Sequence, residues 1–303
     1  MRRTTRFVIS AILLLACITS ISTAQDVILG VLEEVPGTYY GEASSRKVRV
    51  VFEKARTEWA AYPTNCLNLD CFRSATGKFP TEINWNVSFD GRLVGQVTGR
   101  TQDDFRYYSH VGLQDITSNG PVPTVGTKSS EYSGFLSTPV YRPLVAISEP
   151  HFKDPDSWKP AQLDNPSVNS LRRAFRERSP KLCRDSKEDE TKLEPFPYAD
   201  DEIKVLKAYS SNKRWSVVRL HLETAIDCED VEAGFEIPDR WFAIDPHGTI
   251  RYLDQAMWLV DAGDYDNDGR SELMFSIDDY NRGGYRLFYD DFKKHAEFKF
   301  GYH

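Results

Sequence analysis

The run Asp264-Tyr265-Asp266-Asn267-Asp268-Gly269-Arg270-Ser271-Glu272 places four acidic residues around one glycine. Carboxylates two residues apart in a curling loop can turn their oxygens inward, and Ca2+ binds six to eight such oxygens. Without a cation the acids would repel one another. The run therefore predicts a calcium loop, with side-chain ligands from Asp264, Asp266, Asp268 and Glu272 and a backbone carbonyl ligand from Arg270.

The residues on both sides of this loop indicate β-strands. Apolar residues dominate positions 258–260 before it and 273–277 after it. A helix–loop–helix calcium hand needs a bidentate Glu at its twelfth position, which here is Phe275. We therefore expect a strand–loop–strand site in which a structural calcium fixes the angle between two strands. Magnesium is disfavoured because so many protein oxygens suit a larger ion.

The stretch from Gly263 to Phe275 resembles the calcium loop of FG-GAP and VCBS repeats, which occur in integrin-like β-propellers and in bacterial exported proteins. The resemblance implies calcium ligation by the acids already named. It covers only residues 263–275. This sequence has Glu272 where Asp is commoner, and the motif occurs once, although propellers of that family often repeat it.

Alternating β-branched, aromatic and polar residues predict strands through most of the chain. Two hairpins stand out, one around the turn Asp90-Gly91 and one around the turn 245–248. Their similar layout is compatible with an internal repeat. Further strands are predicted at 47–62, 143–148, 203–209, 215–222, 257–260, 272–277, 285–289 and 296–302. The expected fold class is mostly β with antiparallel sheets, and a β-propeller-like arrangement is one option.

Helix is expected only at 168–178, where Leu171, Ala174 and Phe175 have helical spacing. This predicted helix lies in a segment rich in proline and charged residues. The predicted organisation is a signal peptide at 1–24, an N-terminal β region at 25–151, a polar insertion or connection at 152–201, and a C-terminal β region at 202–303. The irregular stretch 118–139 is a natural place for a binding loop.

The N-terminus has the form of a secretory signal, with basic residues before an apolar stretch at 7–18 and small residues at 22–24. The apolar stretch is shorter than the ~20 residues that span a bilayer. A lipid anchor at Cys17 is the alternative to simple cleavage. Removal of the leader takes away three basic residues. Lys and Arg fall from 38 to 35 against 45 acids, so the net charge moves from -7 to -10. This balance argues against nucleic acid as a partner.

Four cysteines follow the leader, and an even number in an exported chain favours disulfides. The preferred pairing is Cys66 with Cys71 and Cys183 with Cys228, among the three connectivities that four cysteines allow. A zinc site is the weaker interpretation, because no CxxC spacing or histidine pair is present.

No catalytic residue is predicted. The six histidines are scattered, and no GxSxG nucleophile elbow occurs. The acids Asp278, Asp279, Asp290 and Asp291 extend an acidic rim or belong to hairpin turns. The sequence indicates an exported, periplasmic or extracellular, calcium-stabilised binding or structural module, with an unknown protein or carbohydrate partner and no transmembrane span in the mature chain. The alternative is a secreted hydrolase of polysaccharide or peptide with a structural calcium.

Overall fold

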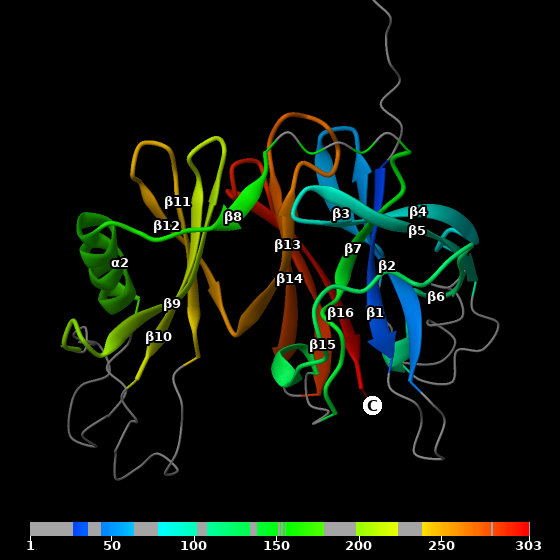
Figure 1. Cartoon of the computed structure of the whole chain (residues 1–303), viewed down its shortest axis with the longest axis horizontal. Helices are drawn as coiled ribbons and strands as arrows, with labels where there is room; N and C mark the ends of the chain where they lie inside the picture. Colours follow the sequence, from blue (N-terminus) through cyan, green and yellow to red (C-terminus); the bar gives the residue numbers. More distant parts are fainter. Residues whose placement is uncertain are drawn as a thin grey trace, which may run out of the picture.

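The fold is mostly β, with antiparallel sheets, as expected from the sequence. The computed structural model describes residues 27–35, 44–63, 78–101, 108–133, 138–150, 152, 154, 156–178, 198–223, 238–279 and 281–302. Within these residues the strands form three sheets, and one α-helix lies at the outer side of one of them (Figure 1).

The first sheet closes on itself as a six-stranded barrel, because β1 pairs with β7 on one side and with β2 on the other. Its strands in spatial order are β1 (Val27–Val35), β7 (Leu144–Ile147), β4 (Glu82–Phe89), β5 (Arg92–Thr101), β6 (Leu113–Thr117) and β2 (Ser45–Ala55). A short strand, β3 (Glu58–Ala61), extends the barrel beside β2. Two single 3-10 turns, η1 (Tyr108–His110) and η2 (Ser130–Tyr132), lie in its connections.

The other two sheets come from the second half of the chain. The five-stranded sheet has the order β12 (Ile250–Gln255), β11 (Arg240–Ile244), β10 (Ser216–Leu222), β9 (Ile203–Ser211) and β8 (Trp158–Pro160). The four-stranded sheet is a meander of β13 (Met257–Gly263), β14 (Glu272–Asp279), β15 (Arg282–Tyr289) and β16 (Lys294–Gly301). Among the described strands β9–β12 and β13–β16 are both antiparallel meanders, as propeller blades are, but the first sheet is a closed barrel, so a propeller is not confirmed.

The layers stack in the order helix, five-stranded sheet, four-stranded sheet, barrel (Figure 1). The middle sheet is apolar on both faces. On β15, Tyr285 and Leu287 pack into the barrel's core, whereas Phe288 packs into the core shared with the five-stranded sheet. Successive side chains of a strand point to opposite faces, so the near-continuous apolar runs of β14 and β15 suit a sheet that is covered on both sides.

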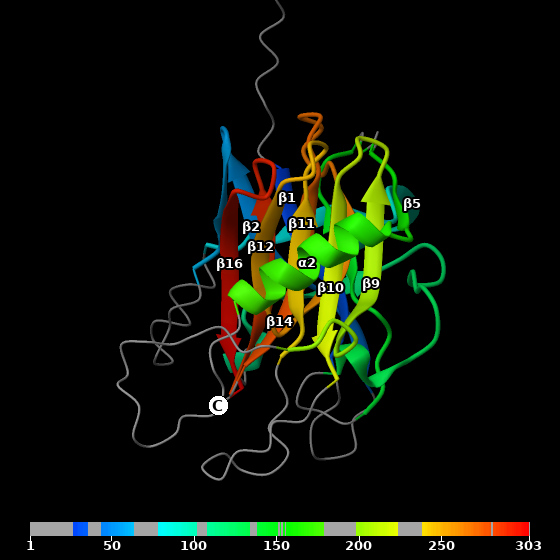
Figure 2. The same ribbon diagram turned by 90° about the vertical axis from the view of Figure 1, so that its left-hand side faces the viewer.

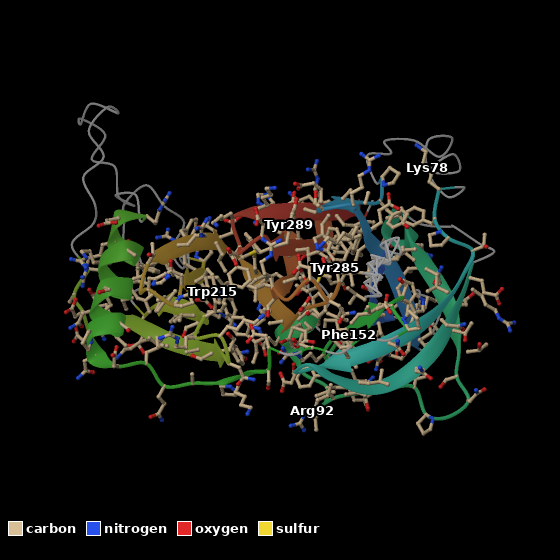
Figure 3. The ribbon with its side chains drawn as sticks, turned by 90° about the horizontal axis from the view of Figure 1, so that it is seen from above. Lys78, Arg92, Phe152, Trp215, Tyr285 and Tyr289 are labelled. Carbon is tan, nitrogen blue, oxygen red and sulfur yellow. The ribbon has the colours of Figure 1, made fainter. Side chains whose placement is uncertain are left out.

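Figure 3, seen from above, shows this layering in the side chains. Trp215 lies on the five-stranded side, and Tyr285 and Tyr289 lie on the four-stranded sheet. Trp215 meets Phe292 edge to face, with ring centroids 4.9 Å apart. Aromatic rings therefore fill much of the space between the two sheets.

The helix, α2 (Asn165–Glu177), lies across the outer face of the five-stranded sheet (Figure 2). It begins three residues before the predicted start, because Asp164 caps it and accepts a hydrogen bond from Ser167 N at 2.9 Å. Leu171 and Phe175 are fully buried on its inner face. The described part of the predicted polar insertion thus contributes both α2 and β8 to this layer.

Both predicted hairpins are present, as β4–β5 and β11–β12. In the first, Asp90 and Gly91 have φ of 49° and 68°, the left-handed pair that a two-residue turn with the strand twist requires. The expected binding loop at 118–139 contains η2, where the Tyr132 hydroxyl donates a hydrogen bond to the carbonyl of Leu259 at 3.2 Å. The described part of that segment therefore forms a hydrogen bond to the four-stranded sheet.

Candidate metal centre

The predicted calcium loop connects β13 to β14, which confirms the strand–loop–strand context. Gly263 and Glu272 form the last pair of the ladder, so residues 264–271 make up the loop. Asn267 and Gly269 have φ of 57° and 87°, and these two left-handed residues curl the loop back on itself.

The loop gathers three of the four predicted carboxylates. One oxygen from each of Asp264, Asp266 and Asp268 lies within 4.8 Å of the others. Glu272 is only 2 % exposed at the base of the loop, where its Oε2 accepts a hydrogen bond from Tyr265 N at 2.9 Å. The acids are therefore held together by the backbone geometry that their spacing predicted.

Backbone N–H groups preorganise these acids. Both oxygens of Asp264 accept hydrogen bonds, Oδ1 from Asp268 N at 3.0 Å and Oδ2 from Gly269 N at 2.7 Å. Asp266 Oδ1 accepts from Asp268 N at 3.0 Å, and Asp268 Oδ1 accepts from Arg270 N at 2.9 Å. The oxygens left over on Asp266 and Asp268 are their Oδ2 atoms.

The side chain of Arg270 turns sideways from the loop. Its guanidinium donates to Asp268 Oδ2 at 3.1 Å and to Asp290 Oδ1 at 2.6 Å. Asp278 accepts from the Tyr302 hydroxyl at 3.2 Å. Asp278 and Asp290 therefore belong to local polar contacts of the β14–β16 meander.

A lysine from the barrel enters the acidic loop. Lys54, on β2, forms an ion pair with Asp266 Oδ2 and lies 3.4 Å from Asp268 Oδ2. Burial lowers the pKa of Lys54, but the bond to Asp266 and the charges of the other acids outweigh it, so the pKa of Lys54 is raised. Sequence reasoning missed Lys54 because it precedes Asp266 by 212 residues and no local pattern marks it.

Burial and crowding leave the loop short of positive charge. Burial raises the pKa of Asp264 to about 6, and the neighbouring acids contribute to the shift. Burial, with the charges of the loop acids, also raises the pKa of Glu272 well above its ordinary value. Four carboxylates face the half-buried ammonium of Lys54 and the half-exposed guanidinium of Arg270, and the Lys213 ammonium contacts the carbonyl of Gly269. A divalent cation with oxygen ligands would offset the remaining negative charge, so the residues present fit Ca2+.

The loop also contacts the five-stranded sheet. Ser271 Oγ donates to Asp156 Oδ2 at 2.9 Å and accepts from Trp158 Nε1 at 3.0 Å. Lys213, in the β9–β10 turn, donates to the carbonyl of Gly269. With Lys54 on the other side, the loop of the middle sheet is bonded to both flanking layers, near the top of Figure 1.

A polar hollow of about 170 Å3 opens beside the loop. Its lining is mixed in charge, and its basic groups are paired: Lys294 with Glu58 at 2.7 Å, and Arg270 with Asp290. Tyr289 donates to the same Glu58 at 2.8 Å. The residues that line it are Lys54, Thr57, Glu58, Asp268, Arg270, Glu272, Tyr289, Asp290 and Lys294.

Several predictions concern residues outside the described part of the chain. They are the leader at 1–24, the lipid anchor at Cys17, and the disulfides of Cys66, Cys71, Cys183 and Cys228. No helix among the described residues has the length and apolar character to cross a membrane. Comparisons of the chain with protein-family models, curated proteins and solved structures found no match.

Proposed function

We propose that this chain is an exported binding or structural module that is stabilised by a calcium ion at the β13–β14 loop. The observation that carries the proposal is the gathering of Asp264, Asp266 and Asp268 on a loop that contacts both neighbouring layers. The calcium has a structural role in this proposal. The binding partner of the chain, a protein or a carbohydrate, is of unknown identity.

The position of the loop supports a structural role. An ion held between two strands of one sheet would stiffen a single hairpin. Here Ser271 of the same loop also bonds Asp156 and Trp158 of the five-stranded layer. An ion that fixes the loop would therefore limit movement between these two layers as well as within one.

The test is thermal unfolding of the mature chain with calcium, with magnesium and with excess chelator. A ligand present at 100 times its Kd stabilises the folded state by about 2.7 kcal/mol. For a mature chain of about 280 residues that corresponds to a rise in Tm of roughly 4–5 °C. Magnesium at the same concentration should give a smaller rise, because it binds poorly in sites built from many protein oxygens.

Two variants make the test specific. Asp264→Asn should abolish the calcium-dependent rise, because it removes a buried charge of the ligand cluster. Asp290→Asn removes an equal charge from the rim, outside the ligand set, and should keep the rise. An unchanged Tm in the natural chain on addition of calcium and of chelator would refute the proposal.

A further inference from the structure

Two of the four carboxylates that calcium would need already contact a cation of the chain. Loop-internal hydrogen bonds use Asp266 Oδ1 and Asp268 Oδ1. The remaining oxygens, Asp266 Oδ2 and Asp268 Oδ2, both contact the Lys54 ammonium, and Asp268 Oδ2 also accepts a hydrogen bond from the Arg270 guanidinium at 3.1 Å. Calcium binds oxygens at 2.3–2.6 Å, so an ion on these atoms would lie within a few ångströms of the ammonium.

We propose that Lys54 competes with metal for this loop: its ammonium must leave Asp266 and Asp268 before an ion can bind them, so Lys54 sets the metal affinity. This inference rests on the proposed calcium function. Two cations cannot share these oxygens, because like charges at such short range repel strongly in a half-buried site. The Lys54 side chain is 13 % exposed and that of Asp266 is 2 % exposed, so water screens the pair poorly.

The displaced ammonium has a place to go. Lys54 is directly opposite Trp59 in the β2–β3 ladder, and its Nζ lies 5.7 Å from the Trp59 ring centroid. Lys54 also lines the polar hollow together with Glu58 and Asp290. Rotation of the flexible side chain into that hollow keeps the charge near an aromatic face and near two acids. The position of the Lys54 side chain on the β2–β3 hairpin would therefore depend on whether the loop holds a metal ion.

Calorimetric titration of calcium into the mature chain tests this inference. Lys54→Met removes the ammonium and keeps the length and apolar character of the stem. We expect its calcium Kd to fall at least tenfold, equivalent to about 1.4 kcal/mol. The matched control is Lys47→Met, on the same strand, which has a similar exposure of 15 % and pairs with a single aspartate outside the loop, Asp115. Its Kd should stay within twofold of the natural value, which excludes a general effect of net charge.

Each outcome separates this inference from the proposed function. Tighter binding by Lys54→Met than by the natural chain supports both. Binding by the variant alone supports the competition and refutes calcium binding by the natural chain. Equal affinities overturn the competition and leave the calcium function standing. No binding by either chain overturns both.

A second measurement uses the natural chain, in case Lys54→Met does not fold. Acylation of lysines by an amine-reactive ester, followed by peptide mass spectrometry, reports how accessible each ammonium is. Calcium should raise the modification rate of Lys54 severalfold and leave that of Lys47 unchanged. An unchanged rate at Lys54 under calcium that saturates the loop would refute the displacement.

Discussion

Asp261 should make the stability of this protein depend on pH, and Asp261→Asn should remove that dependence. Asp261 lies on β13 and is 3 % exposed. Its Oδ1 accepts a hydrogen bond from Asp90 N at 3.2 Å, whereas its Oδ2 has no hydrogen-bond partner among the described residues. Burial raises its pKa from 3.8 to about 7, although two backbone N–H groups and the nearby Arg142 act in the opposite direction.

The direction of the pH dependence follows from the number of protons that the folded and unfolded chains bind. Between pH 4 and pH 7 the folded chain keeps this proton and the unfolded chain loses it, so stability falls as pH rises through that window. A shift of roughly three pKa units at 1.36 kcal/mol each gives a loss on the order of 4 kcal/mol, complete above pH 7. Asn has the same shape and no ionisation, so Asp261→Asn should be more stable than the natural chain at pH 8 and about equally stable at pH 4.

The assay is urea unfolding of both chains from pH 4 to pH 8, in chelator so that metal does not contribute. Other titrating groups cancel when the two free energies of unfolding are subtracted at each pH. Asp201→Asn, at an exposed acid before β9, is the matched control, because it removes one carboxylate without changing the core. A difference for Asp261→Asn that is flat with pH would refute the reasoning.

Three further substitutions test the packing of the layers by urea unfolding. Phe175→Ala should cost about 3–5 kcal/mol, because the ring is fully buried between α2 and the five-stranded sheet; a cost below 1 kcal/mol would contradict that packing. Gly91→Ala should cost about 1–2 kcal/mol, since φ is +68° and a Cβ would lie 2.9 Å from Asp154 Oδ2; an unchanged midpoint would argue against this turn. Arg49→Ala should cost about 3–5 kcal/mol, because it removes the cation that lies 2.6 Å from the Glu33 carboxylate and leaves, among the described residues, only the Tyr285 hydroxyl donating to it, and a neutral result would show that water solvates that carboxylate.

The acidic loop between β13 and β14 shows how much of a site a local sequence pattern can predict. The spacing of Asp264, Asp266 and Asp268 and the turn at Gly269 predicted a strand–loop–strand arrangement, and the structure has it. These features depend on residues within nine positions of one another, so backbone geometry alone brings them together. Lys54 could not be predicted, because it reaches the loop only when the barrel packs against the four-stranded sheet.

Most strand positions were predicted for the same reason, although β1, β6 and β8 were missed, and the partners of distant strands were not predicted. Alternation within β4, β5 and β15 identifies each strand, and the Asp90-Gly91 turn pairs β4 with β5. The pairing of β1 with β7, which together with the β1–β2 pairing closes the barrel, joins residues more than one hundred positions apart, such as Leu29 and Ile147. The amino-acid composition of β1 or of β7 does not indicate that these two strands pair.

The sequence by itself determined a mostly β, antiparallel chain with one short helix and one acidic loop between strands, because each of these depends on neighbours along the chain. Only the tertiary structure decided that the first sheet is a barrel, that the four-stranded sheet is buried on both faces, and that the acidic loop meets Lys54 and Asp156. Those outcomes depend on which apolar faces cover one another. That choice is made by the burial of whole faces, to which every strand contributes and which no single segment specifies.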